Sequence, residues 1–172
     1  KKLKKNFHIN IIFSYFRKID YKYLKYSKHN LLVHESNLPK GRGMSPLTWQ
    51  LLKGKKNITF SLLEADEGID KGKIYFKKKI FIKETALFEE IKKIQLDTNI
   101  KLLLKFLKYY LKFRKPPGCS NQTGKPSYYK KRTPKDSMIN LNKNLKSQIN
   151  LLRVCDYIKY PAYFIYRRKK IY

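Results

Sequence analysis

The chain has 172 residues and a formal net charge of +29, from 41 Lys and Arg against 12 Asp and Glu. This length allows one domain with its own core, and the charge admits an anionic partner, although the Lys side chains are spread as on a solvated surface. Cys119 and Cys155 lie in unrelated contexts, and no apolar run reaches about 18 residues. We therefore expect no zinc or redox site, no membrane span and a cytoplasmic protein.

The first part of the chain alternates predicted strands and helices. The almost continuously apolar stretch from Phe7 to Tyr15 is typical of a buried strand in a parallel sheet. One or two helical turns are expected over Ile19 to Tyr26. A short strand, Leu31 to His34, and a loop, Glu35 to Gly43, follow.

A helix and two further strands come next. Ser45 is the predicted N-cap of a helix that has Pro46 at its first position and ends before Gly54. The apolar run from Ile58 to Leu63 predicts a second buried strand, and the alternation from Lys73 to Ile82 predicts another.

The longest predicted helix begins at Thr85, with Glu89 at a distance typical of a capping box. Asp97 and Thr98 could interrupt this helix. Apolar residues recur along it at helical spacing, which indicates a face packed against a core. They are Leu87, Phe88, Ile91, Ile94, Ile100, Leu103, Leu104, Leu107 and Leu111.

The last part of the chain is predicted to be a loop, a helix and a strand pair. Pro and Gly residues make Arg114–Pro134 an extended loop, a length that is often functional in a compact domain. Within it, Tyr128–Arg132 mixes aromatic and basic groups, either as a contact for a nucleotide or phosphate or as an exposed basic turn. Asn144–Asp156 is the final helix, and a strand pair ends near Tyr172. The face of that helix is expected to carry Ile149, Leu152 and Cys155.

Two groups that can carry chemistry follow predicted strands. His34 ends one strand, and Asp70 lies in the turn after another, between Gly68 and Gly72. In an open α/β fold such strand ends meet at one edge of the sheet, the usual place of a ligand site. We therefore expect the imidazole and the carboxylate to converge there, although a lone His or Asp is more often structural.

The same stretch resembles the catalytic domain of the folate-dependent formyltransferases, among them methionyl-tRNA formyltransferase and the amino-sugar formyltransferases. Their pattern is Asn-x-His-x-Ser-x-x-Pro, then Arg-Gly, a Pro, a Gly and Asp-x-Gly. The matching residues here are His34, Ser36, Pro39, Arg42, Gly43, Pro46, Gly54, Asp70 and Gly72. One position departs from the pattern, because Leu32 stands where the family has the Asn two residues before the His.

The resemblance implies an α/β fold of Rossmann type, with a mostly parallel sheet and flanking helices. The N-terminal part would be missing, because family members carry a nucleotide-fold half before the His motif. Residues 1–113 would be the C-terminal part of the catalytic domain, 114–143 an extended loop or linker, and 144–172 a helix and strand pair that complete the same domain. The missing strands would expose a sheet edge, which a second chain could cover in a homodimer.

The resemblance also implies transfer of a formyl group from 10-formyltetrahydrofolate to a primary amine, without a metal. His34 would stabilise the oxyanion or protonate the leaving nitrogen, and Asp70 would orient His34 or accept the proton of the amine. Ser36, Gly68 and Gly72 would lie beside the folate.

The remaining implied roles concern the substrate and the lost Asn. Arg42 would reach an anionic group of the substrate. The family Asn donates to the formyl oxygen, and strand alternation places Leu32, which cannot donate, on the same face as His34. Asn37 in the next loop is the candidate replacement. Without one, the rate could fall about 10²–10³-fold.

Three functions stay open at this point. We favour an amino-sugar nucleotide as the amine substrate, because no further C-terminal domain follows the catalytic one. Methionyl-tRNA is the alternative acceptor. The third hypothesis is an inactive, basic nucleic-acid-binding protein on a formyltransferase fold, supported by the charge and by Leu32. The fragment could also be inactive as an enzyme.

Overall fold

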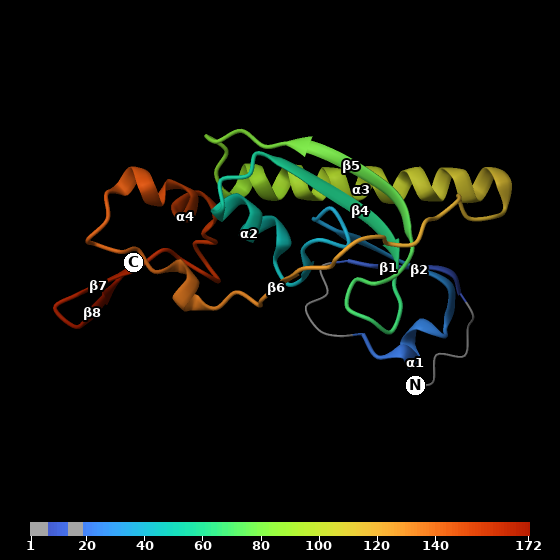
Figure 1. The fold of residues 1–172 in the computed structure, drawn as a ribbon, viewed down its shortest axis with the longest axis horizontal. Helices are drawn as coiled ribbons and strands as arrows, with labels where there is room; N and C mark the ends of the chain where they lie inside the picture. The colour runs from blue at the N-terminus through green and yellow to red at the C-terminus, as the bar shows by residue number, and fades with distance from the viewer. Residues whose placement is uncertain (1–6, 14–18) are drawn as a thin grey trace.

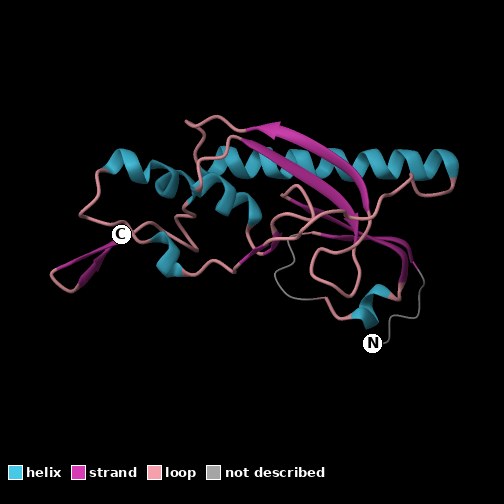
Figure 2. Cartoon of the chain, in the orientation of Figure 1, coloured by secondary structure: helices cyan, strands magenta, loops and turns pink. Residues whose placement is uncertain are grey.

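A computed structural model describes residues 7–13 and 19–172 and shows an α/β fold (Figures 1 and 2). Four strands form the main sheet in the order β1-β2-β4-β5, and the long helix α3 packs along β2, β4 and β5. The elements are β1 (Phe7–Ile12), α1 (Tyr21–Leu24), β2 (Ser27–His34), β3 (Arg42–Gly43), α2 (Pro46–Leu52), β4 (Asn57–Glu64), β5 (Ile74–Phe81), α3 (Phe88–Phe113), β6 (Tyr128–Tyr129), η1 (Pro134–Ser137), η2 (Leu145–Gln148), α4 (Ile149–Val154), β7 (Phe164–Tyr166) and β8 (Lys169–Ile171). The predicted α/β class with flanking helices is confirmed.

The sheet is mixed across the described strands rather than mostly parallel. β1 pairs with β2 in parallel, whereas β2 with β4 and β4 with β5 are antiparallel. The link from β4 to β5 is the short turn 65–73, which is too short for the crossover that a parallel pair needs. Chain reversal at this turn is therefore the reason that β4 and β5 are antiparallel.

The first strand is less buried than its apolar sequence predicts. Phe7 is 44% exposed and Ile11 is 42% exposed, because β1 has β2 as its one strand neighbour among the described residues. The predicted strand ran to Tyr15, and its last two positions lie outside the described residues. α1 forms one turn of the helix expected over Ile19–Tyr26.

The core lies between the sheet and α3, with α2 and α4 at its end. Phe60 of β4 and Phe106 of α3 are fully buried there. The cluster around these two rings has more buried apolar members than the second cluster of the described residues. The other members are Leu31, Leu47, Leu51, Ile58, Leu62, Ile82, Ala86, Ile91, Leu102, Leu103 and Val154.

Helix α3 differs from its prediction at three points. It begins at Phe88, where the Leu87 N–H donates to Glu90 Oε2 at 2.9 Å, so Glu90 rather than Glu89 caps it. It runs without interruption through Asp97 and Thr98. The predicted apolar stripe is only partly buried. Ile91 and Leu103 are in the core, whereas Leu87, Ile100, Leu104 and Leu111 are exposed.

The helix caps and the C-terminal helix show smaller differences. Ser45 does occupy the N-cap position of α2, but its backbone is left-handed (φ 53°) and its side chain makes no capping hydrogen bond. The final helix is split into η2 and α4. It buries Val154 and Cys155, while Ile149 is 50% exposed, so the predicted face was wrong at that residue. The predicted strand pair near the C-terminus is present as β7 and β8.

Among the described helices, none is long and apolar enough to cross a bilayer.

Gly72, just before β5, packs against the backbone of Glu64. A Cβ built at residue 72 would lie 1.6 Å from the Glu64 carbonyl oxygen. We predict that Gly72→Ala lowers the free energy of unfolding by about 1–3 kcal/mol or more, because the two strands must separate. Urea denaturation measures this loss.

Gly118→Ala is the matched control, because no atom lies within 4 Å of a Cβ built there. Equal stability of the two variants would contradict the close packing at residue 72.

Candidate active site

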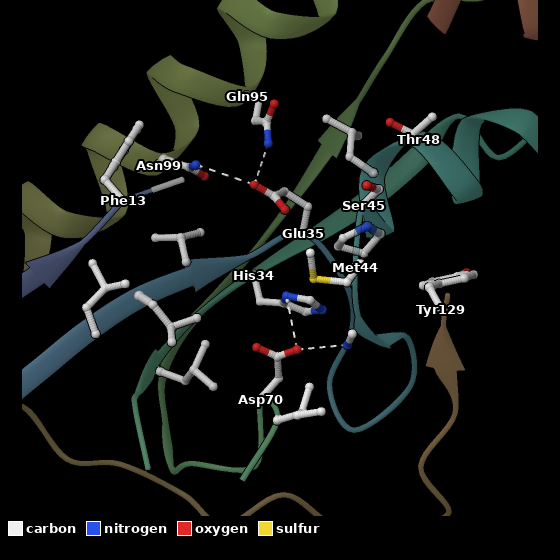
Figure 3. Close-up of a pocket in the computed structure, with 18 of the residues that line it drawn as sticks. Phe13, His34, Glu35, Met44, Ser45, Thr48, Asp70, Gln95, Asn99 and Tyr129 are labelled. Carbon is white, nitrogen blue, oxygen red and sulfur yellow. Dashed lines mark hydrogen bonds and ion pairs between the residues drawn. The ribbon is translucent and has the colours of Figure 1, made fainter. Parts of the chain in front are cut away.

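A pocket of about 430 Å³ opens where β2 ends beside the turn between β4 and β5, and His34 and Asp70 both line it (Figure 3). His34 is the last residue of β2, and its side chain is 7% exposed. Asp70 is 14% exposed, and its Oδ2 lies 3.5 Å from His34 Nδ1. The structure thus brings together the imidazole and carboxylate that the sequence placed at one sheet edge.

The ring of His34 faces hydrogen-bond acceptors on both sides. Nε2 lies 2.7 Å from the carbonyl oxygen of Gly41, and Nδ1 faces the Asp70 carboxylate. A neutral imidazole has one N–H and can satisfy one of these acceptors, whereas the imidazolium has two. Each ring nitrogen of His34 therefore has an acceptor within reach, so the ring is oriented from both sides.

Asp70 is held in a constrained position. Its backbone is left-handed (φ 51°), a conformation that Asp tolerates better than most residues. The N–H of Gly43 donates to Oδ2 at 2.8 Å. Oδ1 has no hydrogen bond within the described chain, so one oxygen is occupied by the protein and the other can accept from a bound molecule.

A clamp made by Gln122 fixes the turn that carries Asp70. The Gln122 amide donates to the carbonyl oxygens of Asp70 (2.7 Å) and Gly72 (2.9 Å). Its own Oε1 accepts from the guanidinium of Arg42 at 2.7 and 3.2 Å. Sequence reasoning missed Gln122, because nothing near it in the chain marks a loop residue that contacts a turn 50 positions earlier.

Arg42 is placed differently from the expectation that it binds substrate. It is buried, 8% exposed, and its guanidinium contacts Gln122 and the hydroxyl of Tyr128. The structure therefore places Arg42 in the support of the Asp70 turn, where it does not line the pocket.

The start of the same turn is anchored by Glu64. Its carboxylate accepts from the Tyr75 hydroxyl at 2.6 Å and from the backbone N–H of Asn30, and lies 3.4 Å from His29 Nδ1. Burial and then this hydrogen bond raise the pKa of Tyr75 far above its usual range. Glu64, the last residue of β4, thus links β2 to β5. The turn that carries Asp70 follows it in the chain.

The other residues expected near folate or the formyl oxygen are divided between the pocket and its surroundings. Leu32 lines the pocket, as strand alternation predicted, so an apolar side chain stands at the position of the family Asn. Asn37, in the loop after β2, is not brought to the pocket. Its Oδ1 instead accepts from Lys77 Nζ of β5 at 2.7 Å. Gly68 lines the pocket. Ser36 is buried and does not line it, and Gly72 is outside it as well.

A second polar group in the pocket wall was not anticipated. Glu35, next to His34, directs its carboxylate to α3, where Oε1 accepts from Gln95 at 2.6 Å and from Asn99 at 3.5 Å (Figure 3). The Glu35 carbonyl accepts from Gln50 of α2 at 2.6 Å. These contacts fix the chain directly after His34, and no local pattern in the sequence marks Gln95 or Asn99 for this role.

The segment Tyr128–Arg132 fits neither of its two interpretations as a whole. Tyr128 and Tyr129 form β6, pair with Arg42–Gly43 and line the pocket. Arg132 is 6% exposed and donates to Ser137 Oγ at 2.8 Å. The aromatic half therefore belongs to the pocket and the Arg to the interior.

Across the described ranges, no cluster of three His, Cys, Asp or Glu side chains is arranged to hold a metal.

The sequence that builds this site matches a known family. A model of the family described as Formyl transferase matches residues 3–107, which is more than half of the chain. The chain belongs to the formyl transferase family. The recognition made from the His34 and Asp70 motifs is thereby confirmed.

Curated relatives are consistent with this membership. Methionyl-tRNA formyltransferase of Thermosipho melanesiensis is 32% identical over 124 residues, which cover 72% of this chain and 39% of the relative. The bifunctional polymyxin resistance protein ArnA of Wigglesworthia glossinidia brevipalpis is 35% identical over 150 residues, 84% of this chain and 22% of that protein. The formyl transferase chain thus spans well under half the length of these relatives.

Solved structures show the same fold. Methionyl-tRNA formyltransferase from Clostridium thermocellum has a TM-score of 0.65 at 26% identity, covering 83% of this chain and 60% of that one. HypX from Aquifex aeolicus in complex with tetrahydrofolic acid has a TM-score of 0.75 at 19% identity, covering 96% of this chain and 28% of that one. A sugar N-formyltransferase from Shewanella has a TM-score of 0.65 at 23% identity, covering 84% of this chain and 59% of that one. The last two likenesses concern the fold alone.

The Gln122 clamp gives a prediction for the Asp70 turn. Gln122→Ala removes both hydrogen bonds to the turn and the Gln122 acceptor of the Arg42 guanidinium, so we expect a loss of about 1–3 kcal/mol of stability. Hydrogen exchange of the amides from Gly68 to Gly72 should become faster, because the turn opens locally.

Asn121→Ala is the control, since the Asn121 side chain makes no hydrogen bond in the described chain. If the exchange rates of the turn were the same in both variants, Gln122 would not be what holds Asp70.

Proposed function

We propose that this protein is an N-formyltransferase that moves a formyl group from 10-formyltetrahydrofolate to a primary amine. The observation that carries the proposal is the His34–Asp70 pair, 3.5 Å apart, in a pocket on the face of a formyl transferase fold. Acyl transfer to an amine needs a group that accepts the amine proton and a donor for the carbonyl oxygen or the leaving nitrogen. Asp70 and His34 are groups of these two kinds.

The pocket suits a partly apolar donor with a few polar groups. Its volume of about 430 Å³ lies in the range of small-molecule sites, and apolar walls from Leu32 and Ile69 accompany a few polar groups. 10-Formyltetrahydrofolate, once bound, would supply the formyl carbon and a nitrogen leaving group. The complex of HypX with tetrahydrofolic acid supports a folate in this fold.

The proton positions follow from the hydrogen bonds of the pair. Asp70 Oδ1 has no partner among the described residues, and it would accept the proton of the attacking amine. The His34 ring, between two acceptors, would hold the proton that the oxyanion or the leaving nitrogen needs. The Gly43 N–H keeps Asp70 Oδ2 toward His34, so both side chains stay oriented during transfer.

We infer an amino-sugar nucleotide as the acceptor, with methionyl-tRNA as the alternative. A sugar N-formyltransferase that shares the fold is consistent with the first acceptor. The methionyl-tRNA formyltransferases among the relatives support the second. Incubating the chain with 10-formyltetrahydrofolate and either UDP-linked amino sugar or methionyl-tRNA separates them by mass spectrometry of the product. A formylated amine in neither reaction would contradict the proposed activity.

The catalytic pair gives a direct test. His34→Asn and Asp70→Asn should each lower kcat about 10²–10⁴-fold, because each removes a proton-transfer group while keeping a polar side chain of similar size. His8→Asn and Asp97→Asn, on exposed residues outside the pocket, are the controls. A reduction of the same size in the controls would refute the assigned roles.

The departure at residue 32 gives a gain-of-function prediction. Leu32→Asn would restore an amide donor in the pocket wall, and kcat should rise by up to about 10²–10³-fold, the value of one oxyanion donor. Leu32→Ala removes the same bulk without adding a donor and should not raise kcat. An equal rise in both variants would show that space, not hydrogen bonding, limits the rate.

A further inference from the structure

A second hollow, of about 290 Å³, lies between the loop Asn37–Lys40, strand β5 and the loop Ser120–Lys125. Ile74 of β5 and Ser120 exchange two backbone hydrogen bonds of 2.9 Å, which fix one side of it. The Ser127 N–H donates to the Pro39 carbonyl at 3.4 Å and ties the two loops together. The hollow shares no lining residue with the pocket of His34 and Asp70, so it is a separate site.

All the charged residues that line the hollow are basic. Lys40, Lys77 and Lys125 face it, and no Asp or Glu is among its lining residues. The ion pairs of the described residues involve other side chains, so none of these three ammonium groups is paired with a carboxylate in that part of the chain. A concave site with one sign of charge raises the local concentration of the opposite ion.

Lys77 is held in a fixed position. Its Nζ donates to Asn37 Oδ1 at 2.7 Å and to the Leu38 carbonyl at 2.8 Å, which uses two of its three N–H groups. Burial lowers the pKa of Lys77. One N–H of an oriented, partly desolvated ammonium therefore remains for a ligand, and an anion there would offset the cost of burial.

Neutral donors complete the lining. The hydroxyls of Ser120 and Thr123 and the amide of Asn121 border the hollow and make no side-chain hydrogen bond within the described chain. Ammonium groups together with hydroxyl and amide donors suit an anion that has several acceptor oxygens. A phosphate has more such oxygens and more charge than a carboxylate.

We propose that this hollow binds a phosphate group, with Lys77 as the anchor and Lys40 and Lys125 contacting the remaining oxygens. A nucleoside diphosphate and an RNA strand both present this group. Gln122 connects the site to catalysis, because it lines the hollow while its side chain holds the Asp70 turn. Binding is measured without a formyl donor, so its outcome does not depend on the proposed transferase activity.

The test is calorimetric titration of the whole chain with inorganic pyrophosphate at low ionic strength. Lys77→Gln and Lys125→Gln should each weaken binding about tenfold or more, the value of one charge-assisted contact. Lys125 makes no hydrogen bond or ion pair in the described chain, so its variant should keep the fold, and thermal unfolding checks both. Lys93→Gln and Lys101→Gln, exposed on α3, remove the same charge and should change affinity less than about twofold.

The outcomes separate a specific site from general attraction. No binding of pyrophosphate, or equal weakening in all four variants, would overturn the proposal. Competition then identifies the source of the phosphate. Displacement by UDP but not by an RNA octamer supports a nucleotide, and the reverse supports RNA. Displacement by neither would mean that pyrophosphate is an adventitious ion only, and would overturn the site.

Discussion

The hydrogen bonds that hold the turn of Asp70 against the end of β2 are the constraint on which the site depends. Asp70 has a left-handed backbone, and neither its own sequence nor the flanking glycines would keep it in one place. The Gly43 N–H fixes the carboxylate, and Gln122 fixes the carbonyl groups on both sides of Lys71. Without these contacts the 3.5 Å approach to His34 Nδ1 would be one of many positions of a mobile turn.

The site is assembled from segments far apart in the chain, and each is supported by a different part of the fold. His34 is placed by the strand β2, and the next residue is tied to α3 through Glu35 and to α2 through its carbonyl. Asp70 is placed by the turn and by the loop that carries Gln122. Leu31 of β2 and Leu62 of β4 belong to the core cluster around Phe60 and Phe106, so the same packing holds the two strands that lead to His34 and to the turn of Asp70.

The basic composition acquires a local meaning in the structure. Most Lys side chains lie on the surface, as composition suggested, but three gather around one hollow beside the loop that follows His34. This concentration arises from tertiary structure, since Lys40, Lys77 and Lys125 come from two loops and a strand. A general positive field and a local phosphate site are different physical claims, and they differ in how selectively single Lys substitutions weaken binding.

The sequence by itself determined the family, the strand that ends in His34, the strand before the turn of Asp70, and the meeting of these two groups at one edge of a sheet. These features depend on local periodicity and on ordered motif residues, which are visible along the chain. Only the tertiary structure decided that β4 and β5 are antiparallel, that Arg42 supports a turn, and that Asn37 points to Lys77. It also supplied Gln122 and Glu35, because a hydrogen bond between residues 50 or more positions apart leaves no local pattern.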